Sequence, residues 1–242
     1  MKLYPDVNFD FKNKNVLVVG GSKGIGQEVC RLFDLYNAKN VYSVARTHCN
    51  IKNIKNIICD ISDTECLLDS IDKIEDNIDI LVNVAGTNLC ESINIIDDKE
   101  WDRVLNINLK SFFVVIKYFS NKMKKAGSGK IVNVSSIAGR SKSIVSGVHY
   151  TASKYGIIGL TKQAAQELGP YGINVNCTCP SQTMTEMLNK SMTEKNIKEL
   201  ELKIPLRKIS SVFEQAMPIL FLCTDAASYI HGAAIDVNGG QL

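Results

Sequence analysis

The fold is decided by residues 15–36, which read NVLVVGGSKGIGQEVCRLFDLY. The stretch opens with a short apolar run rich in β-branched residues, which predicts a buried strand. A glycine-rich turn follows, and the apolar residues after the turn recur at helical spacing. A strand, a glycine turn and a helix in this order indicate the first unit of an open α/β fold.

The glycines of this turn, at positions 20, 24 and 26, form the pattern G-x-x-x-G-x-G. The commoner dinucleotide pattern is G-x-G-x-x-G, but the physical basis is the same. Residues without Cβ let the backbone turn tightly and approach a pyrophosphate, which the free amides and positive end of the next helix attract. We therefore interpret the turn as a nucleotide site rather than as a plain tight turn.

The rest of the chain repeats the alternation of strand and helix. Further strands are predicted at 40–45, 57–59, 79–84, 130–134, 173–179 and 233–237. Long helices are predicted at about 99–124 and 150–169, whereas the polar link after Arg46 leaves no room for one. The pattern predicts one domain over 1–242, a Rossmann-like, doubly wound parallel sheet of about seven strands with helices on both faces.

Composition excludes several classes of protein. The 242 residues are 45% hydrophobic and 22% charged, with a net charge of +3, so a core can form and scattered lysines do not indicate a nucleic-acid partner. The eight cysteines are irregularly spaced, which is typical of reduced cytoplasmic proteins and gives no metal site. Without a long apolar run we expect a cytoplasmic protein, neither exported nor membrane-spanning.

Most of the chemistry lies in residues 130–161, KIVNVSSIAGRSKSIVSGVHYTASKYGIIGLT. Tyr150 and Lys154 are four residues apart, so on a helix their side chains leave the same face. A nearby ammonium would lower the pKa of the phenol and make it a usable acid or base. The alternative is a partly buried tyrosine beside a lysine that reaches solvent. Ser136, at the end of a predicted strand, would meet a substrate carbonyl or else serve as a helix cap.

Other polar residues suggest how a cofactor would be bound. Arg46 ends the second predicted strand, where an arginine suits a 2′-phosphate, and Lys23 could add a second cation. We therefore favour NADP(H) over NAD(H), the alternative being that both are solvated surface cations. Asp60 or Ile61 would contact the adenine, unless residues 60–63 only cap the next helix. Asn108 interrupts an apolar helical stripe, as a structural hydrogen bonder or as part of a proton path.

Nearly the whole chain, from about Lys14 to Gly240, resembles the short-chain dehydrogenase/reductase family of about 250 residues. The matching segments are Gly20-Gly21-Ser22-Lys23-Gly24-Ile25-Gly26, Asp60, Asn83-Val84-Ala85-Gly86, Asn108, Ser136, Tyr150-Thr151-Ala152-Ser153-Lys154 and Asp236-Val237-Asn238-Gly239-Gly240. The sequence departs from the family at Val19, usually a threonine, at Pro180-Ser181, usually Pro-Gly, and in the short link after Arg46.

The resemblance implies hydride transfer between a nicotinamide and a carbonyl or alcohol. Tyr150 would be the acid and base, Ser136 would hold the carbonyl oxygen, and Lys154 would bind the ribose and lower the tyrosine pKa. Asn108 would hold a water in the proton relay. With the residue-level reasoning above, the expected cofactor contacts are Gly20, Ser22, Lys23, Gly24, Ile25, Gly26, Arg46, Asp60, Ile61, Asn83, Ala85, Gly86, Tyr150, Lys154, Pro180, Ser181 and Thr183.

The leading hypothesis is therefore an NADPH-dependent reductase of a ketone on a small or carrier-linked metabolite, such as a 3-oxoacyl compound. The rivals are an NAD-dependent alcohol or sugar dehydrogenase, which the polar Ser181-Gln182-Thr183 patch favours, and a catalytically silent nucleotide-binding regulatory protein. Residues 181–210 are either a cover over the substrate cleft or a surface excursion. The family implies a homotetramer or homodimer, and the predicted apolar helices could form the interface.

Overall fold

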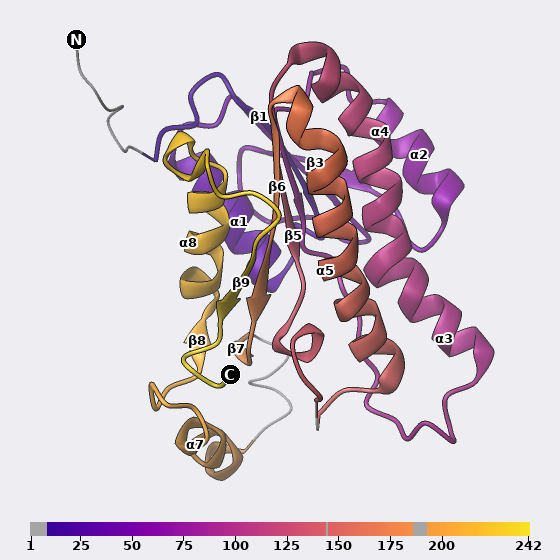
Figure 1. Ribbon diagram of the computed structural model, residues 1–242, viewed down its shortest axis with the longest axis vertical. Helices are drawn as coiled ribbons and strands as arrows, with labels where there is room; N and C mark the ends of the chain where they lie inside the picture. Colours follow the sequence, from indigo (N-terminus) through magenta and orange to yellow (C-terminus); the bar gives the residue numbers. More distant parts are fainter. Residues whose placement is uncertain (1–8, 144, 186–192) are drawn as a thin grey trace.

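The computed structural model describes residues 9–143, 145–185 and 193–242, and its centre is a parallel sheet. Seven strands pair in the order β3-β2-β1-β4-β5-β6-β9, every pair parallel (Figure 1). The strands are β1 (Asn15–Val19), β2 (Asn40–Ala45), β3 (Ile54–Ile58), β4 (Ile80–Asn83), β5 (Gly129–Val134), β6 (Ile173–Pro180) and β9 (Ala234–Val237). The predicted doubly wound parallel sheet is confirmed.

Helices cover both faces of this sheet. The α-helices of the described residues are α1 (Gly24–Leu35), α2 (Thr64–Asp72), α3 (Asp98–Leu105), α4 (Ser111–Ala126), α5 (Val148–Leu168), α7 (Glu194–Leu202) and α8 (Val212–Leu222), of which α7 lies beyond the end of the sheet (Figure 1). Helices α1 and α8 pack together on one face, while α2, α4 and α5 cover the other (Figure 1). The chain order reverses between β1 and β4, and open α/β sheets bind ligands at the carboxyl ends of the strands beside such a reversal, a position called the crevice below.

Strand β1 shows why its sequence is apolar from Val16 to Val19. Leu17 and Val19 point into the core under α2, α4 and α5, whereas Val16 and Val18 point into the core under α1 and α8. Successive strand residues face opposite sides, so a strand covered on both faces has no solvated position. Parallel sheets of this kind are therefore built from continuous apolar runs.

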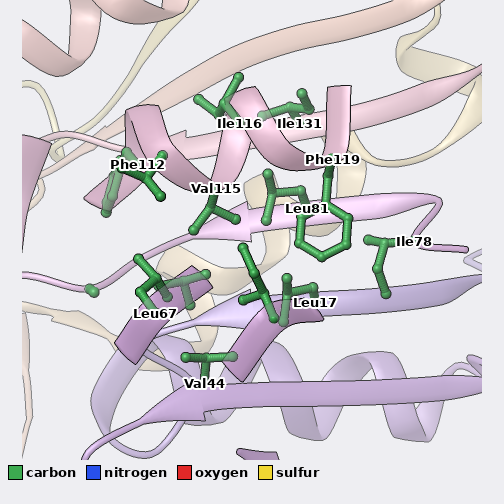
Figure 2. Packing of buried hydrophobic residues seen from close by; sticks show 14 of the residues in the cluster. Leu17, Val44, Leu67, Ile78, Leu81, Phe112, Val115, Ile116, Phe119 and Ile131 are labelled. Atoms are coloured by element: carbon green, nitrogen blue, oxygen red, sulfur yellow. The ribbon is translucent and has the colours of Figure 1, made fainter. Parts of the chain in front are cut away.

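The core under α4 is the larger of the two buried clusters. Figure 2 shows Phe112 and Phe119 of α4 against the sheet, with Leu17 of β1, Leu81 of β4 and Leu67 of α2 around them. All five side chains have no exposed surface. Their packing fixes the height and rotation of α4 above the strands, and thereby the position of the chain that enters α4.

The structure corrects three predicted elements. The helix expected at 99–124 is three segments, α3, a π-helical turn at Asn106–Lys110, and α4. The third strand begins at Ile54 rather than Ile57, because it pairs with β2 along its length. A second sheet, in which β7 (Thr183–Met184) pairs with β8 (Ser210–Ser211), had no signal in the sequence, since each strand has only two residues.

The link between β2 and β3 agrees with expectation, since its described residues form no helix. Among the residues that the structure describes, no helix combines the length and apolar character needed to cross a bilayer.

Helix α4 offers a test of the core with a built-in control. We expect Phe119→Ala, at a side chain with no exposed surface, to lower the free energy of unfolding by about 3–5 kcal/mol, because it leaves a cavity under the helix. Phe113, on the same helix, is 50% exposed, so Phe113→Ala should change this free energy by less than about 0.5 kcal/mol. Denaturant unfolding measures both, and equal losses would contradict the packing described here.

Candidate active site

The glycine turn after β1 lies close to the end of β4. Gly20 has a φ of +94°, and a Cβ on it would lie 2.6 Å from the backbone nitrogen and Cα of Ala85. A Cβ on Gly26 would lie 2.1 Å from the carbonyl oxygen of Gly20. Side chains at these two positions would overlap with backbone, so only glycine lets the turn fold this tightly.

Helix α1 begins at this turn, with its amino end next to the glycines. Lys23 precedes the helix in an extended conformation, its side chain does not cap the first amides, and the first turn carries no acid. Such a terminus attracts an anion. The hydroxyl of Thr47 donates to that of Ser22 at 3.0 Å, which joins the turn to the loop after β2. Ile25 instead packs partly into the core under α1.

The ends of β2 and β3 bring opposite charges together. Arg46 is exposed directly after β2, and its charge, with that of Arg103, helps to lower the pKa of Asp60. The larger cause is hydrogen bonding, because Asp60 Oδ1 accepts from the amide of Ser62 at 3.0 Å and from its hydroxyl at 2.8 Å. Ile61 is buried. The cap of α2 is Asp63, not Asp60.

Tyr150 and Lys154 lie one turn apart at the start of α5, as predicted. The Lys154 ammonium lies 5.5 Å from the centre of the Tyr150 ring and donates to the carbonyl oxygen of Val134 at 3.0 Å. Lys154 is 3% exposed. A Cβ on Gly86 would meet Lys154 Nζ at 3.5 Å and Asn108 Oδ1 at 3.7 Å, so these three residues surround one point beyond the end of β4.

The prediction that Lys154 lowers the pKa of Tyr150 is wrong for the protein without a cofactor. Burial raises the pKa of Tyr150, and the opposing influence is a hydrogen bond with Ser136 rather than the lysine charge. Burial also lowers the pKa of Lys154 to about 8. Desolvation disfavours the charged form of either group, so in this dry pocket it outweighs their mutual attraction. Lys154 still keeps its proton at neutral pH.

The two serines after β5 have different roles. Ser135 donates its hydroxyl to the carbonyl oxygen of Lys154 at 2.8 Å and is buried, so it secures α5 against the strand. Ser136 accepts from the amide of Ala138 at 3.1 Å, which caps the short helix Ile137–Gly139. Its hydroxyl proton remains available for Tyr150 or for a ligand oxygen. Of these two hydroxyls, that of Ser135 already donates to the backbone, so Ser136 is the one left to meet a ligand.

Asn108 is positioned by the π-helical turn Asn106–Lys110. It has no exposed surface, and its amide nitrogen donates to the carbonyl oxygen of Thr87 at 2.9 Å and to the hydroxyl of Ser153 at 3.1 Å. Its oxygen accepts from the Thr87 amide at 2.8 Å. A π turn inside a helix is often found at a functional site. Asn108 is therefore a structural hydrogen bonder, as one of the two interpretations of the sequence expected. Its position beside Lys154 also fits the other interpretation, a part in a proton path.

The residues expected near the nicotinamide lie at the ends of two strands, β4 and β6. Asn83 is fully buried and donates to the side chain of Asn133 at 2.9 Å, so it braces β4 against β5 below the crevice. Above, Pro180 ends β6 and Thr183 donates to the carbonyl oxygen of Ser181 at 3.1 Å. The chain then passes over α1, since a Cβ on Gly24 would lie 3.4 Å from Thr185. Residues 186–192, within the predicted cover, lie outside the described residues.

Sequence reasoning missed two groups that order the site. Ser153 bonds Asn108 and donates to the carbonyl oxygen of Tyr150 at 2.6 Å. His149 has no exposed surface, and its Nδ1 accepts from the amide of Tyr150 at 2.9 Å. The position of Ser153 between Tyr150 and Lys154 was a usable signal, whereas a histidine in the first turn of a helix was not.

Comparison with known proteins places this arrangement in a family. The family model described as short chain dehydrogenase matches residues 14–196. An acetoacetyl-CoA reductase from Acinetobacter is 32% identical over 244 residues, covering 95% of this chain and 98% of the relative. The chain belongs to the short-chain dehydrogenase family, and is an oxidoreductase of carbonyl or alcohol groups that uses a nicotinamide dinucleotide.

Two solved structures extend the likeness to the fold. A 3-oxoacyl-[acyl-carrier protein] reductase from Brucella melitensis with bound NAD has a TM-score of 0.88 and 28% identity, with 100% of this chain and 97% of that chain covered. ElxO with NADP bound has a TM-score of 0.86 and 30% identity, covering 95% and 98%. Similar structures thus hold either NAD or NADP.

The buried lysine makes a pH-dependent prediction for the unliganded protein. The unfolded chain keeps the Lys154 proton up to its ordinary pKa of 10.5, whereas the folded chain releases it near pH 8. Between these values the unfolded state binds more protons, so the stability contributed by Lys154 rises with pH. We expect the free energy of unfolding of the native protein, minus that of Lys154→Met, to increase from pH 8 to 10.5. A flat or falling difference would contradict the burial of a charged amine.

Proposed function

We propose that the protein is an NADPH-dependent reductase of a ketone on a small or carrier-linked metabolite, most closely a 3-oxoacyl thioester. The observation that carries this proposal is the convergence of Asn108, Ser136, Tyr150 and Lys154 beyond the carboxyl ends of β4 and β5, beside the glycine turn. The names of relatives that reduce acetoacetyl-CoA or 3-oxoacyl carrier proteins support the substrate class.

The residues around the crevice fit a dinucleotide. Side chains at Gly20 and Gly26 would overlap with backbone, and α1 begins at this turn with no acid in its first turn, which suits a pyrophosphate. Gly86 leaves space next to Lys154 where a ribose could lie. In this proposal the adenine half extends toward Asp60 and Ile61, while Ala85, Pro180, Ser181 and Thr183 border the nicotinamide half. When bound, the nicotinamide supplies the hydride.

The protein's own groups would orient the substrate and move a proton. The Ser136 hydroxyl donates to the carbonyl oxygen of the substrate, and the Tyr150 phenol gives its proton to the same oxygen as negative charge develops there. The raised pKa of Tyr150 keeps the phenol protonated before reaction, which suits an acid. Lys154 binds the ribose, and its charge stabilises the phenolate left after transfer.

Replacement of the proton would follow a path through Lys154 and Asn108. The ends of these two side chains lie near the same point, 3.5 Å and 3.7 Å from where a Cβ on Gly86 would be, and both residues are buried. A water held there by Asn108 would connect the lysine to solvent. This role is the proton-path alternative for Asn108, and the hydrogen bonds to Thr87 and Ser153 hold the amide ready for it.

The choice of NADPH depends on the cations at the adenine end. Arg46 is exposed where a 2′-phosphate would lie, and exposed Lys23 is in the glycine turn nearby. Asp60 interacts with Arg46, but hydrogen bonds to Ser62 hold its carboxylate. Arg46 is therefore available for a phosphate. A similar solved structure holds NAD, so the kinetics with NADPH are best compared directly with those with NADH.

A second candidate is an NAD-dependent alcohol or sugar dehydrogenase. Among the residues that the structure describes, the buried side-chain oxygen of Gln182 has no hydrogen-bond partner, and it lies between Ser181 and Thr183 in the chain. A hydroxylated substrate would supply the missing donor. A silent nucleotide-binding protein is less well supported, because a binding module does not need the complete set of Asn108, Ser136, Tyr150 and Lys154.

We further propose a homotetramer or homodimer, with residues 181–210 as the substrate cover. Trp101, Phe113 and Tyr155 of α3, α4 and α5 are 38%, 50% and 49% exposed, which gives these helices apolar surface to bury between subunits. All eight cysteines are free thiols, which suits a reducing compartment such as the cytoplasm.

Removal of the phenol hydroxyl tests the reaction. We expect Tyr150→Phe to lower kcat for a 3-oxoacyl thioester by about 10²-fold or more, since the general acid is lost, while the Kd for NADPH stays nearly unchanged. Tyr155→Phe, five residues further along α5 and 49% exposed, is the matched control and should keep full activity. Loss of nicotinamide absorbance measures turnover, and full activity of Tyr150→Phe would exclude the proposed acid.

Reversal of charge at Arg46 tests the cofactor. We expect Arg46→Asp to raise the KM for NADPH about ten- to a hundredfold and to lower the KM for NADH, because a carboxylate repels the 2′-phosphate and accepts from a ribose hydroxyl. Lys117→Asp, an exposed change of equal charge on α4, should leave the NADPH to NADH ratio unchanged. An unaltered ratio for Arg46→Asp would overturn this assignment.

A further inference from the structure

Two cysteines outside the catalytic groups lie almost within bonding distance. The sulfur atoms of Cys59 and Cys66 are 3.0 Å apart. Cys59 directly follows β3 and is 3% exposed, whereas Cys66 lies in the first turn of α2 and is partly exposed. A disulfide bond needs about 2.05 Å between the sulfurs, so a movement of roughly 1 Å would join them.

Both cysteines are held in this arrangement by the backbone. The amide of Cys59 donates to the carbonyl oxygen of Ala45 at 3.1 Å, which fixes it to the end of β2. The amide of Cys66 donates to the capping carboxylate of Asp63 at 3.1 Å, which fixes it to the start of α2. The short loop between them therefore presents the two thiols to each other in the folded protein.

The remaining cysteines do not share this combination of contact and access. All eight lie in the part of the chain that the structure describes, and five of the other six are buried, namely Cys30, Cys49, Cys177, Cys179 and Cys223. Cys90 is exposed, and no hydrogen bond or other contact joins its sulfur to another thiol among these residues. Only Cys66 is both reachable from solvent and in contact with a second thiol.

We propose that Cys59 and Cys66 form a redox modification site, which a peroxide converts into a reversible intramolecular disulfide. The more accessible Cys66 sulfur attacks one peroxide oxygen, and the O–O bond breaks to give a sulfenic acid and water. The Cys59 sulfur then attacks the Cys66 sulfur, and the displaced hydroxyl leaves with the Cys59 proton as a second water. Two thiols and one hydrogen peroxide thus become one disulfide and two waters.

The pKa of Cys59 agrees with this order of events. Burial and the neighbouring sulfur raise it to about 12, so Cys59 has little thiolate with which to meet the oxidant first. Its role is to resolve the sulfenic acid formed on Cys66. A sulfenic acid with a thiol already in contact closes to a disulfide before a second peroxide can oxidise it further.

The disulfide would act on the cofactor site, a step that depends on the proposed roles of Asp60 and Ile61. Both residues lie in the loop between the two sulfurs, and the carboxylate of Asp60 is held by Ser62 in the same loop. Drawing the start of α2 toward β3 must reshape this loop. We expect oxidation to raise the KM for NADPH at least twofold, with kcat unchanged because the catalytic groups lie on other elements.

Mass spectrometry can identify the bond directly. The purified protein is treated with an equimolar amount of hydrogen peroxide, remaining thiols are blocked with N-ethylmaleimide, and the chain is digested with trypsin. Cleavage after Lys55 and Lys73 leaves both cysteines in one peptide, 56–73, whereas Cys90 alone lies in 74–99. Peptide 56–73 should carry no maleimide and lack two hydrogens, and dithiothreitol should restore both labelling sites.

Variants separate the pair from general oxidation. Cys66→Ser should abolish the lighter form of peptide 56–73, and the loss of NADPH affinity with it, whereas Cys90→Ser should leave both unchanged. Two maleimides on peptide 56–73 after peroxide treatment, or a sulfinic acid on Cys66 with Cys59 still labelled, would overturn the proposal. A disulfide that leaves the KM for NADPH unaltered would overturn its effect on the cofactor site, and an enzyme without NADPH turnover before oxidation would instead refute the proposed function.

Discussion

Everything in this structure depends on the closeness of the glycine turn to the end of β4. Gly20 approaches the backbone of Ala85 so tightly that a side chain on Gly20 would overlap with it. Parallel pairing of β1 with β4, in which Val19 faces Asn83, brings the ends of both strands to one edge of the sheet. The start of α1, the Gly86 backbone and the first turn of α5 then lie at that edge.

Next to this tightly packed backbone, the site buries two ionisable side chains, Tyr150 and Lys154, which costs free energy. Lys154 is 3% exposed, and its ammonium has the Val134 carbonyl but no carboxylate partner among the residues described. Tyr150 is likewise desolvated, so the empty site raises the pKa of the phenol and lowers that of the amine. Burying groups that are more stable in water is typical of functional sites, where chemistry rather than stability selects the residue. The large apolar cores on both faces offset that cost.

The sequence was informative where one residue type admits one conformation. Apolar runs located the strands, glycines located the turn, and the spacing of Tyr150 and Lys154 placed both on one helix face. It failed where tertiary context decides. Nothing in residues 106–110 distinguishes a π turn from an α-helix, and the β7–β8 pair depends on chain segments far apart in sequence. The direction of the Tyr150 pKa shift depended on how much water the fold excludes, which no local pattern records.

The π turn at Asn106–Lys110 also links two properties that look independent. Such a turn holds one more residue than the regular helix around it. Deletion of one residue there would return the segment to a regular α-helix and leave α3 and α4 in nearly the same rotation, so the aromatic face of α4 would stay on the sheet. Asn108, however, would lose the bulged position from which its side chain reaches Thr87 and Ser153. The chain could therefore shorten by one residue at this point and keep its core while losing the buried amide beside Lys154.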